Sequence, residues 1–140
     1  MRVFFDSSAF VKRFVQEVGS EQVDKACMAA SALGLSVICL PEMLSALNRK
    51  VREGVLLQAD YAALKQAIAE DIEGAEIVNL GTDVLRHTVV LLEQNTLRSL
   101  DAVHIACALE WGAEQFVSAD KRQVQAAQNV GLSVQFIGGL

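Results

Sequence analysis

Short apolar runs alternate with longer segments of helical periodicity along this chain, and the alternation constrains the fold more than any other feature. Each run is too short for a typical helix and is rich in Val, Ile, Leu or Phe. Runs of this kind between helices are typical of a mainly parallel sheet with right-handed crossovers. The sequence therefore predicts an α/β fold. The expected strands are Arg2–Phe5, 35–40, 76–78, 115–118 and 132–137.

The segments between these runs carry apolar residues three and four positions apart, which indicates helices. A helix over 19–33 is expected to end at Gly34, and Pro41 suits the start of the next helix, which runs to Gly54. The helix at 82–94 is so rich in Val and Leu that we expect it to be buried on more than one side. The other expected helices are a short one after Asp6, then 57–72, 99–112 (capped by Ser99) and 121–129.

Length and composition favour one domain over residues 1–140, which is long enough to bury a core. No apolar run approaches the roughly 18 residues of a membrane span, and Asp6 comes too early for a signal peptide. We therefore expect a cytoplasmic protein without membrane contact. The three cysteines, Cys27, Cys39 and Cys107, lie far apart among apolar residues, which favours reduced thiols in the core over a disulfide or zinc site.

Four acidic residues stand where parallel sheets commonly bind ligands. Asp6 and Asp120 each come at the end of an expected strand, and Glu42 and Asp101 lie in the first turn of expected helices. Because ligands bind beyond the carboxyl ends of parallel strands, the four carboxylates can converge on one pocket. Such a cluster suits Mg²⁺ or Mn²⁺. Acids are also common at helix starts as caps or dipole partners, and this ordinary role stays open for each.

The net charge of −5, from 12 basic and 17 acidic residues, is unfavourable for holding a polyanion. If cations neutralise the four acids, the balance becomes 12 − 13 = −1. Eight of the basic residues lie within ten positions of one of those acids, either as a nucleic-acid surface or as solvated helix faces. They are Lys12, Arg13, Arg49, Lys50, Arg52, Arg98, Lys121 and Arg122.

The segments around the four acids resemble the PIN-domain ribonucleases, and within them the VapC-type toxins of bacterial toxin–antitoxin pairs. The resemblance spans the chain and rests on four motifs in order, each containing one acid. They are VFFDSSAFVK at 3–12, PEMLSAL at 41–47, LRSLDAVHIA at 97–106 and FVSADKR at 116–122. Ala119 departs from the family pattern, since relatives often carry a larger or more polar residue there.

The resemblance implies a PIN-like three-layer α/β/α sandwich and hydrolysis of RNA phosphodiester bonds with Mg²⁺ (or Mn²⁺) as cofactor. Asp6, Glu42, Asp101 and Asp120 would hold the metal, directly or through water, and form the catalytic site. A metal-activated water would attack phosphorus, so the reaction needs no protein nucleophile. Further candidates for contact with substrate or metal-bound water are Ser8, Ser118, Arg98 and Lys121.

The implied partners are RNA, a cognate VapB-type antitoxin and a second copy of the chain in a two-fold homodimer. The helical hairpin expected between Val37 and Ile72, together with the apolar helices, offers candidate surfaces for both protein partners. Truncating Tyr61 and Leu64 to Ala should therefore weaken antitoxin binding more than cleavage of free RNA.

Other functions fit the sequence less well. A receiver domain needs a second acid beside Asp6, and a haloacid-dehalogenase-like phosphatase needs an Asp where Ser8 stands. The alternative from another class is a catalytically silent PIN-fold protein that acts by binding, but all four acids are present. His104 lies one helical turn after Asp101, yet its apolar neighbours favour a buried, hydrogen-bonded imidazole over a general base; the same holds for His87.

Overall fold

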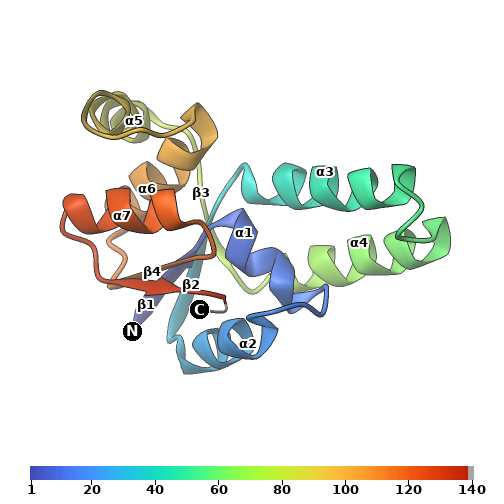
Figure 1. The fold of residues 1–140 in the computed structure, drawn as a ribbon. Helices are drawn as coiled ribbons and strands as arrows, with labels where there is room; N and C mark the ends of the chain where they lie inside the picture. Colours follow the sequence, from blue (N-terminus) through green and yellow to red (C-terminus); the bar gives the residue numbers. More distant parts are fainter. Residues whose placement is uncertain (139–140) are drawn as a thin grey trace.

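A parallel five-stranded sheet forms the centre of the protein in the computed structural model, which describes residues 1–138 (Figure 1). The strand order is β3-β2-β1-β4-β5, and every neighbouring pair is parallel. The strands are β1 (Arg2–Phe5), β2 (Ala32–Ser36), β3 (Glu76–Val78), β4 (Gln115–Ser118) and β5 (Val134–Phe136). The predicted α/β class is confirmed, while the expectation of one domain over 1–140 stays a prediction.

Helices make the connections between these strands. Those expected at 57–72, 82–94, 99–112 and 121–129 agree with the structure to within one residue at each end. No helix in residues 1–138 is long and apolar enough to cross a membrane. The helices are α1 (Ser7–Phe10), the 3-10 helix η1 (Val11–Arg13), α2 (Ser20–Ala29), α3 (Cys39–Arg52), α4 (Gln58–Ile72), α5 (Thr82–Gln94), α6 (Ser99–Trp111) and α7 (Lys121–Asn129).

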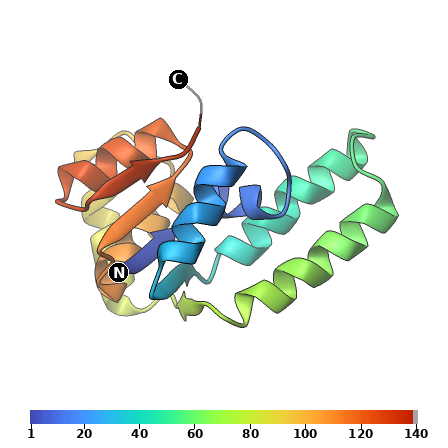
Figure 2. The same cartoon turned by 90° about the horizontal axis from the view of Figure 1, so that it is seen from below.

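The helices form a layer on each face of the sheet. Successive residues of a strand point to opposite faces, so both faces carry apolar side chains that helices cover. In β1, Val3 and Phe5 pack in a core with residues of α1 to α4, whereas Phe4 packs with α5 to α7. Both views show α3 and α4 as a hairpin that extends beyond the sheet (Figures 1 and 2). The three-layer sandwich is as predicted.

The prediction was wrong between residues 30 and 40. Helix α2 ends at Ala29 instead of 33, and β2 occupies Ala32–Ser36 instead of 35–40. Gly34 does not end a helix but lies inside β2, where an added Cβ would come within 2.9 Å of three ring atoms of Trp111. The glycine therefore makes room for an indole on the distant helix α6.

Helix α5 is buried on one side only, which corrects the expectation of burial on several sides. Val84 and Leu91 are buried in the core that α5 shares with α6. Leu85 and Val89, in contrast, are 50% and 55% exposed. The apolar composition of this helix thus serves an open surface as well as the core.

Smaller corrections concern the ends of elements and the thiols. Helix α3 begins at Cys39, so Pro41 lies within its first turn, where a missing N–H removes no helical bond. Arg98 and not Ser99 is the N-cap of α6, and β5 covers only 134–136 of the expected 132–137. All three cysteines are free; Cys39 and Cys107 are buried, as expected, and Cys27 is half-buried.

The topology directs attention to the carboxyl ends of β1 and β4. The chain moves from β1 outward to β2 and β3, then returns to the other side of β1 to add β4 and β5. Open α/β sheets bind ligands in the crevice where the strand order reverses in this way. Asp6 directly follows β1, and Asp120 lies two residues beyond β4.

Candidate active site

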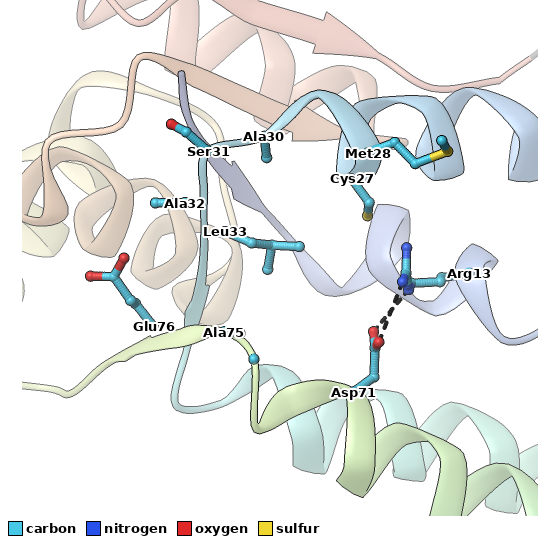
Figure 3. A pocket seen from close by; sticks show the side chains of 11 residues that line it. Arg13, Cys27, Met28, Ala30, Ser31, Ala32, Leu33, Asp71, Ala75 and Glu76 are labelled. Carbon is cyan, nitrogen blue, oxygen red and sulfur yellow. Dashed lines mark hydrogen bonds and ion pairs between the residues drawn. The ribbon is translucent and has the colours of Figure 1, made fainter.

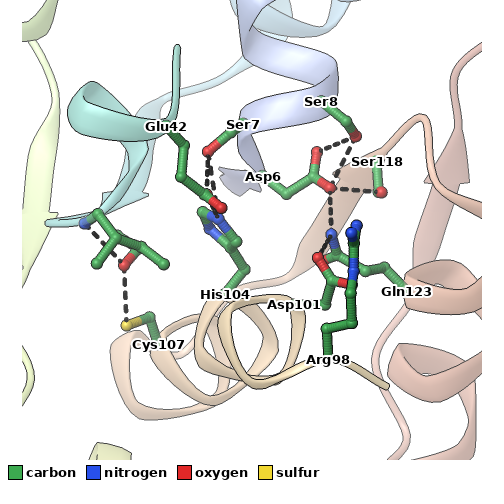
Figure 4. A network of polar contacts seen from close by, with 12 residues as sticks. Asp6, Ser7, Ser8, Glu42, Arg98, Asp101, His104, Cys107, Ser118 and Gln123 are labelled. Atoms are coloured by element: carbon green, nitrogen blue, oxygen red, sulfur yellow. Dashed lines mark hydrogen bonds and ion pairs between the residues drawn. The ribbon is translucent and has the colours of Figure 1, made fainter. Parts of the chain in front are cut away.

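Four elements bring the four predicted acids to this edge of the sheet. Asp6 is the N-cap of α1, Asp120 is the N-cap of α7, and Glu42 and Asp101 lie in the first turns of α3 and α6. A cavity of about 220 Å³ is lined by Glu42, Asp101 and Asp120. Asp6 lies beneath it, fully buried, and Figure 4 shows its carboxylate pointing toward the same network.

Hydrogen-bond donors surround the Asp6 carboxylate. It accepts bonds from Ser118 Oγ at 2.7 Å, Ser8 Oγ at 2.8 Å, the Ala9 backbone N–H at 2.9 Å and Gln123 Nε2 at 2.8 Å. Burial raises the pKa of Asp6 above its ordinary value, and the nearby His104 together with the hydrogen bonds from Ser118, Ala9 and Ser8 offsets only part of the shift. The site therefore holds a carboxylate whose charge is costly until a positive group compensates it.

The pKa of Glu42 is shifted in the opposite direction from that of Asp6. Its Oε1 accepts a hydrogen bond from Ser7 Oγ at 2.7 Å and contacts His104 Nε2 at 2.5 Å. Burial alone would raise the pKa of Glu42, but the bonds from His104 and Ser7 and the charge of Arg98 hold it below its ordinary value. His104 is 1% exposed, so it is the buried, hydrogen-bonded imidazole that the sequence favours.

Asp101 and Asp120 both accept hydrogen bonds from Gln123. Asp101 accepts from Arg98 Nε and from Gln123 Nε2, each at 3.3 Å. Asp120 Oδ1 accepts the backbone N–H groups of Arg122 at 2.8 Å and Gln123 at 3.3 Å. Capping is thus a real role of Asp120, as it is of Asp6, and it leaves the side chain at the cavity.

The other predicted contact residues divide into two groups. Ser8 and Ser118 both donate to Asp6; Ser8 also lines the cavity, whereas Ser118 is fully buried. Arg98 borders the cavity, with a side chain that is 83% exposed. Lys121 has no hydrogen bond or ion pair to the four acids within residues 1–138; its Nζ lies 6.0 Å from the ring centre of Phe136.

Sequence reasoning missed two residues of the network, Ser7 and Gln123. Ser7 stands beside Asp6 in the first motif, but nothing in that motif pointed to Glu42 as its partner. Gln123 did leave a signal, because it lies three and four positions before Ala126 and Ala127, on the buried side of α7. A polar side chain in that position needs a polar partner.

The donor set fits a hard divalent cation. No group of three or more His, Cys, Asp or Glu side chains in the described part of the chain forms a ready metal cluster. Mg²⁺, however, usually takes only one or two carboxylates and completes its shell with water. Asp6 and Asp101 share one donor atom, Nε2 of Gln123, so a cation in its place would meet both carboxylates.

A second cavity, of about 370 Å³, lies away from this site beside the amino ends of β2 and β3 (Figure 3). Its charged pair is Arg13 and Asp71, whose Nε and Oδ2 atoms are 2.8 Å apart. The two charges compensate each other, and none of the four acids lines this cavity. The smaller, acidic cavity is therefore the candidate active site.

Comparison with known proteins gives the family. Residues 3–129 match the PIN domain, and the chain therefore belongs to the PIN-domain family. It is 31% identical over 134 residues to ribonuclease VapC45 of Mycobacterium tuberculosis, an alignment that covers 94% of this chain and 93% of that protein. The identity is the same to ribonuclease VapC49 from another strain of that organism.

Solved structures agree with this fold. DNA-bound VapBC from Salmonella typhimurium superposes with a TM-score of 0.71 at 12% identity, covering 97% of this chain and 98% of that one. VapC20 of Mycobacterium tuberculosis, described as a sarcin-ricin loop cleaving toxin, gives 0.69 at 14% identity over 93% and 95%. At such identities the likeness concerns the fold, and it confirms the PIN-like sandwich.

Proposed function

We propose that this protein is a metal-dependent endoribonuclease and the toxin of a type II toxin–antitoxin pair. The observation that carries the proposal is the convergence of Asp6, Glu42, Asp101 and Asp120 at the reversal point of the sheet. That arrangement occurs in a chain similar to a named ribonuclease over almost its whole length. The cofactor we propose is Mg²⁺, or Mn²⁺ in its place, because the donors are hard carboxylate oxygens.

The chain's own residues divide the work in this proposal. A bound cation would lower the pKa of a water molecule and neutralise charge on the phosphate. Asp6 anchors the positive charge from below, since its burial makes its own ionisation unfavourable without a cation. Glu42, kept ionised by His104 and Ser7, accepts hydrogen bonds from water at the cavity wall and orients it.

Basic side chains beside the cavity support RNA as the substrate. Arg98 borders the acidic cavity on one side. A neighbouring groove of about 420 Å³ beside α7 is lined by Lys121, Arg122 and several Asn and Gln side chains, with no acid among them. Such a groove suits the phosphates and base edges that flank a cleaved bond, whereas the acidic cavity alone would repel RNA.

The first test is cleavage of total RNA by the purified protein with Mn²⁺ or Mg²⁺ and with chelator. We expect Asp6→Asn and Asp101→Asn to lower the metal-dependent rate at least a hundredfold, with the circular dichroism spectrum unchanged. Asp83→Asn is the matched control, because Asp83 lies in the first turn of α5 and its side chain is 60% exposed. Its rate should equal that of the wild type.

Two results would contradict the proposed nuclease function. One is cleavage that survives both substitutions, which indicates a contaminant. The other is binding of the cation without cleavage of any RNA, which would support the catalytically silent binding protein instead.

We propose that the antitoxin binds the α3–α4 hairpin. Val55 and Leu57 at its tip are 73% and 71% exposed, so they can contact a partner without supporting the core. Tyr61 and Leu64 are partly buried against that core, and truncating them would also loosen the hairpin. Val55→Asp with Leu57→Asp is therefore the cleaner pair of changes, expected to weaken antitoxin binding and leave cleavage of free RNA intact.

For the homodimer we propose the open face of α5, where Leu85 and Val89 are one turn apart and half exposed. Leu85→Asp with Val89→Asp should give monomers in sedimentation. A cytoplasmic location accords with three free cysteines, which persist as thiols in a reducing compartment.

A further inference from the structure

Gln123 touches three of the four acids of the candidate site, yet its own amide is only half satisfied. Nε2 donates to Asp6 Oδ2 at 2.8 Å and to Asp101 Oδ1 at 3.3 Å, and the backbone N–H donates to Asp120 at 3.3 Å. The side chain is 3% exposed, and its Oε1 is buried without a hydrogen-bond partner. Figure 4 shows the amide placed between the two carboxylates.

A buried amide oxygen without a partner is unusual, because nearly all buried polar atoms in proteins are hydrogen-bonded. The Gln123 amide is planar, and its N and O ends have nearly the same shape. A half-turn about the last side-chain bond therefore exchanges Nε2 and Oε1 without a change of volume. The present orientation, with the NH₂ group between two carboxylates, is the one that electrostatics favours while no cation stands there.

Asp6 gives a reason why the amide has to turn when a cation arrives. Its Oδ2 accepts hydrogen bonds from Ser118 and Gln123, Oδ1 accepts from Ala9, and the single hydroxyl proton of Ser8 is donated to one of the two oxygens, each 2.8 Å from Ser8 Oγ. A carboxylate offers about four lone-pair positions, so both oxygens are saturated. Removing the Gln123 donor frees a position on Oδ2 at the point that also faces Asp101.

We propose that Gln123 is a fifth ligand of the divalent cation, whose amide donates to Asp6 and Asp101 in the metal-free protein and turns to offer Oε1 to the bound ion. The inference rests on the proposed function, since it names a further residue for that cation. Amide oxygens are ordinary ligands of hard cations. The turned amide would also give Oε1 the partner that it lacks.

Two simpler roles make different predictions. If Gln123 only fills space between α7 and the sheet, removing its amide changes stability but leaves the affinity for Mn²⁺ as it was. If it only competes with the cation for the carboxylates, removing the amide raises the affinity. The affinity falls if Gln123 is a ligand, and it also falls if the amide only orients the two carboxylates. Only the ligand role predicts in addition that the NH₂ group leaves the carboxylates when the cation binds.

The test is calorimetric titration of the folded protein with Mn²⁺, which needs no RNA. Gln123→Met keeps a side chain of similar length without oxygen or N–H, and we expect its affinity to fall roughly tenfold or more. Gln123→Glu restores an oxygen and should bind at least as tightly as the wild type. Gln128→Met, an exposed position on the same helix, is the matched control and should bind like the wild type.

A spectroscopic readout follows the amide itself. In ¹⁵N-labelled protein, Mg²⁺ should move the side-chain NH₂ signals that disappear in Gln123→Met, because these protons leave the two carboxylates. Unchanged or tighter Mn²⁺ binding by Gln123→Met, or NH₂ signals that stay fixed while Mg²⁺ shifts the Asp101 backbone signal, would overturn the ligand role. A wild type that binds no Mn²⁺ overturns both proposals, whereas binding without RNA cleavage overturns only the nuclease.

Discussion

Replacing Gly34 by Ala will destabilise the protein, although the backbone at this position is open to any L residue. The new Cβ would lie 2.9 Å from three ring atoms of Trp111, and ordinary contacts begin at 3.4 Å. The indole has to move by about 0.5 Å or more to relieve the overlap. It cannot move freely, because the Arg2 guanidinium lies 3.9 Å from its centre on one side and the Phe4 ring lies 6.0 Å away.

Two terms decide the size of the effect. Overpacking of this kind costs about 1–3 kcal/mol. The loss of glycine's freedom in the unfolded chain returns about 0.4–1 kcal/mol. The cost of the overlap is the larger of the two. We expect the free energy of unfolding to fall by about 1–2 kcal/mol, which lowers the unfolding midpoint of a domain of this size by roughly 3–8 °C.

The assay is urea unfolding followed by fluorescence, since Trp111 is the only tryptophan. Gly74→Ala is the matched control, because its Cβ would meet nothing closer than the Asp71 backbone oxygen at 3.6 Å, and its stability should hold or rise slightly. In a Trp111→Leu background, followed by circular dichroism, Gly34→Ala should cost much less. A Gly34→Ala protein as stable as the wild type would show that the Trp111 indole moves away from the new Cβ without cost.

Three further predictions concern the acidic cavity. Without cation at neutral pH, Asp6→Asn should unfold at a higher temperature than the wild type, because the raised pKa of Asp6 makes its ionised form destabilising. This difference should vanish below pH 3.8, the ordinary pKa of an Asp. The measurement is thermal unfolding between neutral pH and pH 3, and equal midpoints at neutral pH would contradict the prediction. His104→Leu should lower the free energy of unfolding, measured in urea, by about 2 kcal/mol, because the hydrogen bond to the ionised Glu42 is lost. The stability that ionised Glu42 contributes above its lowered pKa is lost with it. Arg98→Ala should change stability by less than about 0.5 kcal/mol, because its pair with Asp101 is exposed, yet weaken RNA binding in chelator and flatten its salt dependence; binding equal to the wild type at both low and high salt would count against it.

The sequence was most informative where local chemistry and position coincide. Asp6 and Asp120 stand at strand ends and Glu42 and Asp101 in first helical turns. The structure places Glu42, Asp101 and Asp120 around one cavity, with Asp6 buried beneath it. Strand and helix patterns report such positions directly, because each depends on neighbours a few residues away.

Contacts between segments that are far apart in the sequence could not be predicted from local patterns. Gly34 follows a helical pattern, and only the indole of Trp111, on another helix, reveals it as a strand residue. The partnership of Gln123 with Asp6 crosses from α7 to the end of β1. The composition of α5 does not show which of its Leu and Val residues are buried either, because these residues occur both in the core and on exposed surfaces.

The order in which the site is completed follows from the place of β1 in the sheet. The donors Ser118 and Gln123 are synthesised 112 and 117 positions after Asp6. At translation rates of roughly 5–20 residues per second, about 6–23 seconds pass between the synthesis of Asp6 and that of these donors. A nascent chain in which β4 and α7 have not yet been made therefore lacks two donors to Asp6 as well as Asp120, so its acidic site is incomplete.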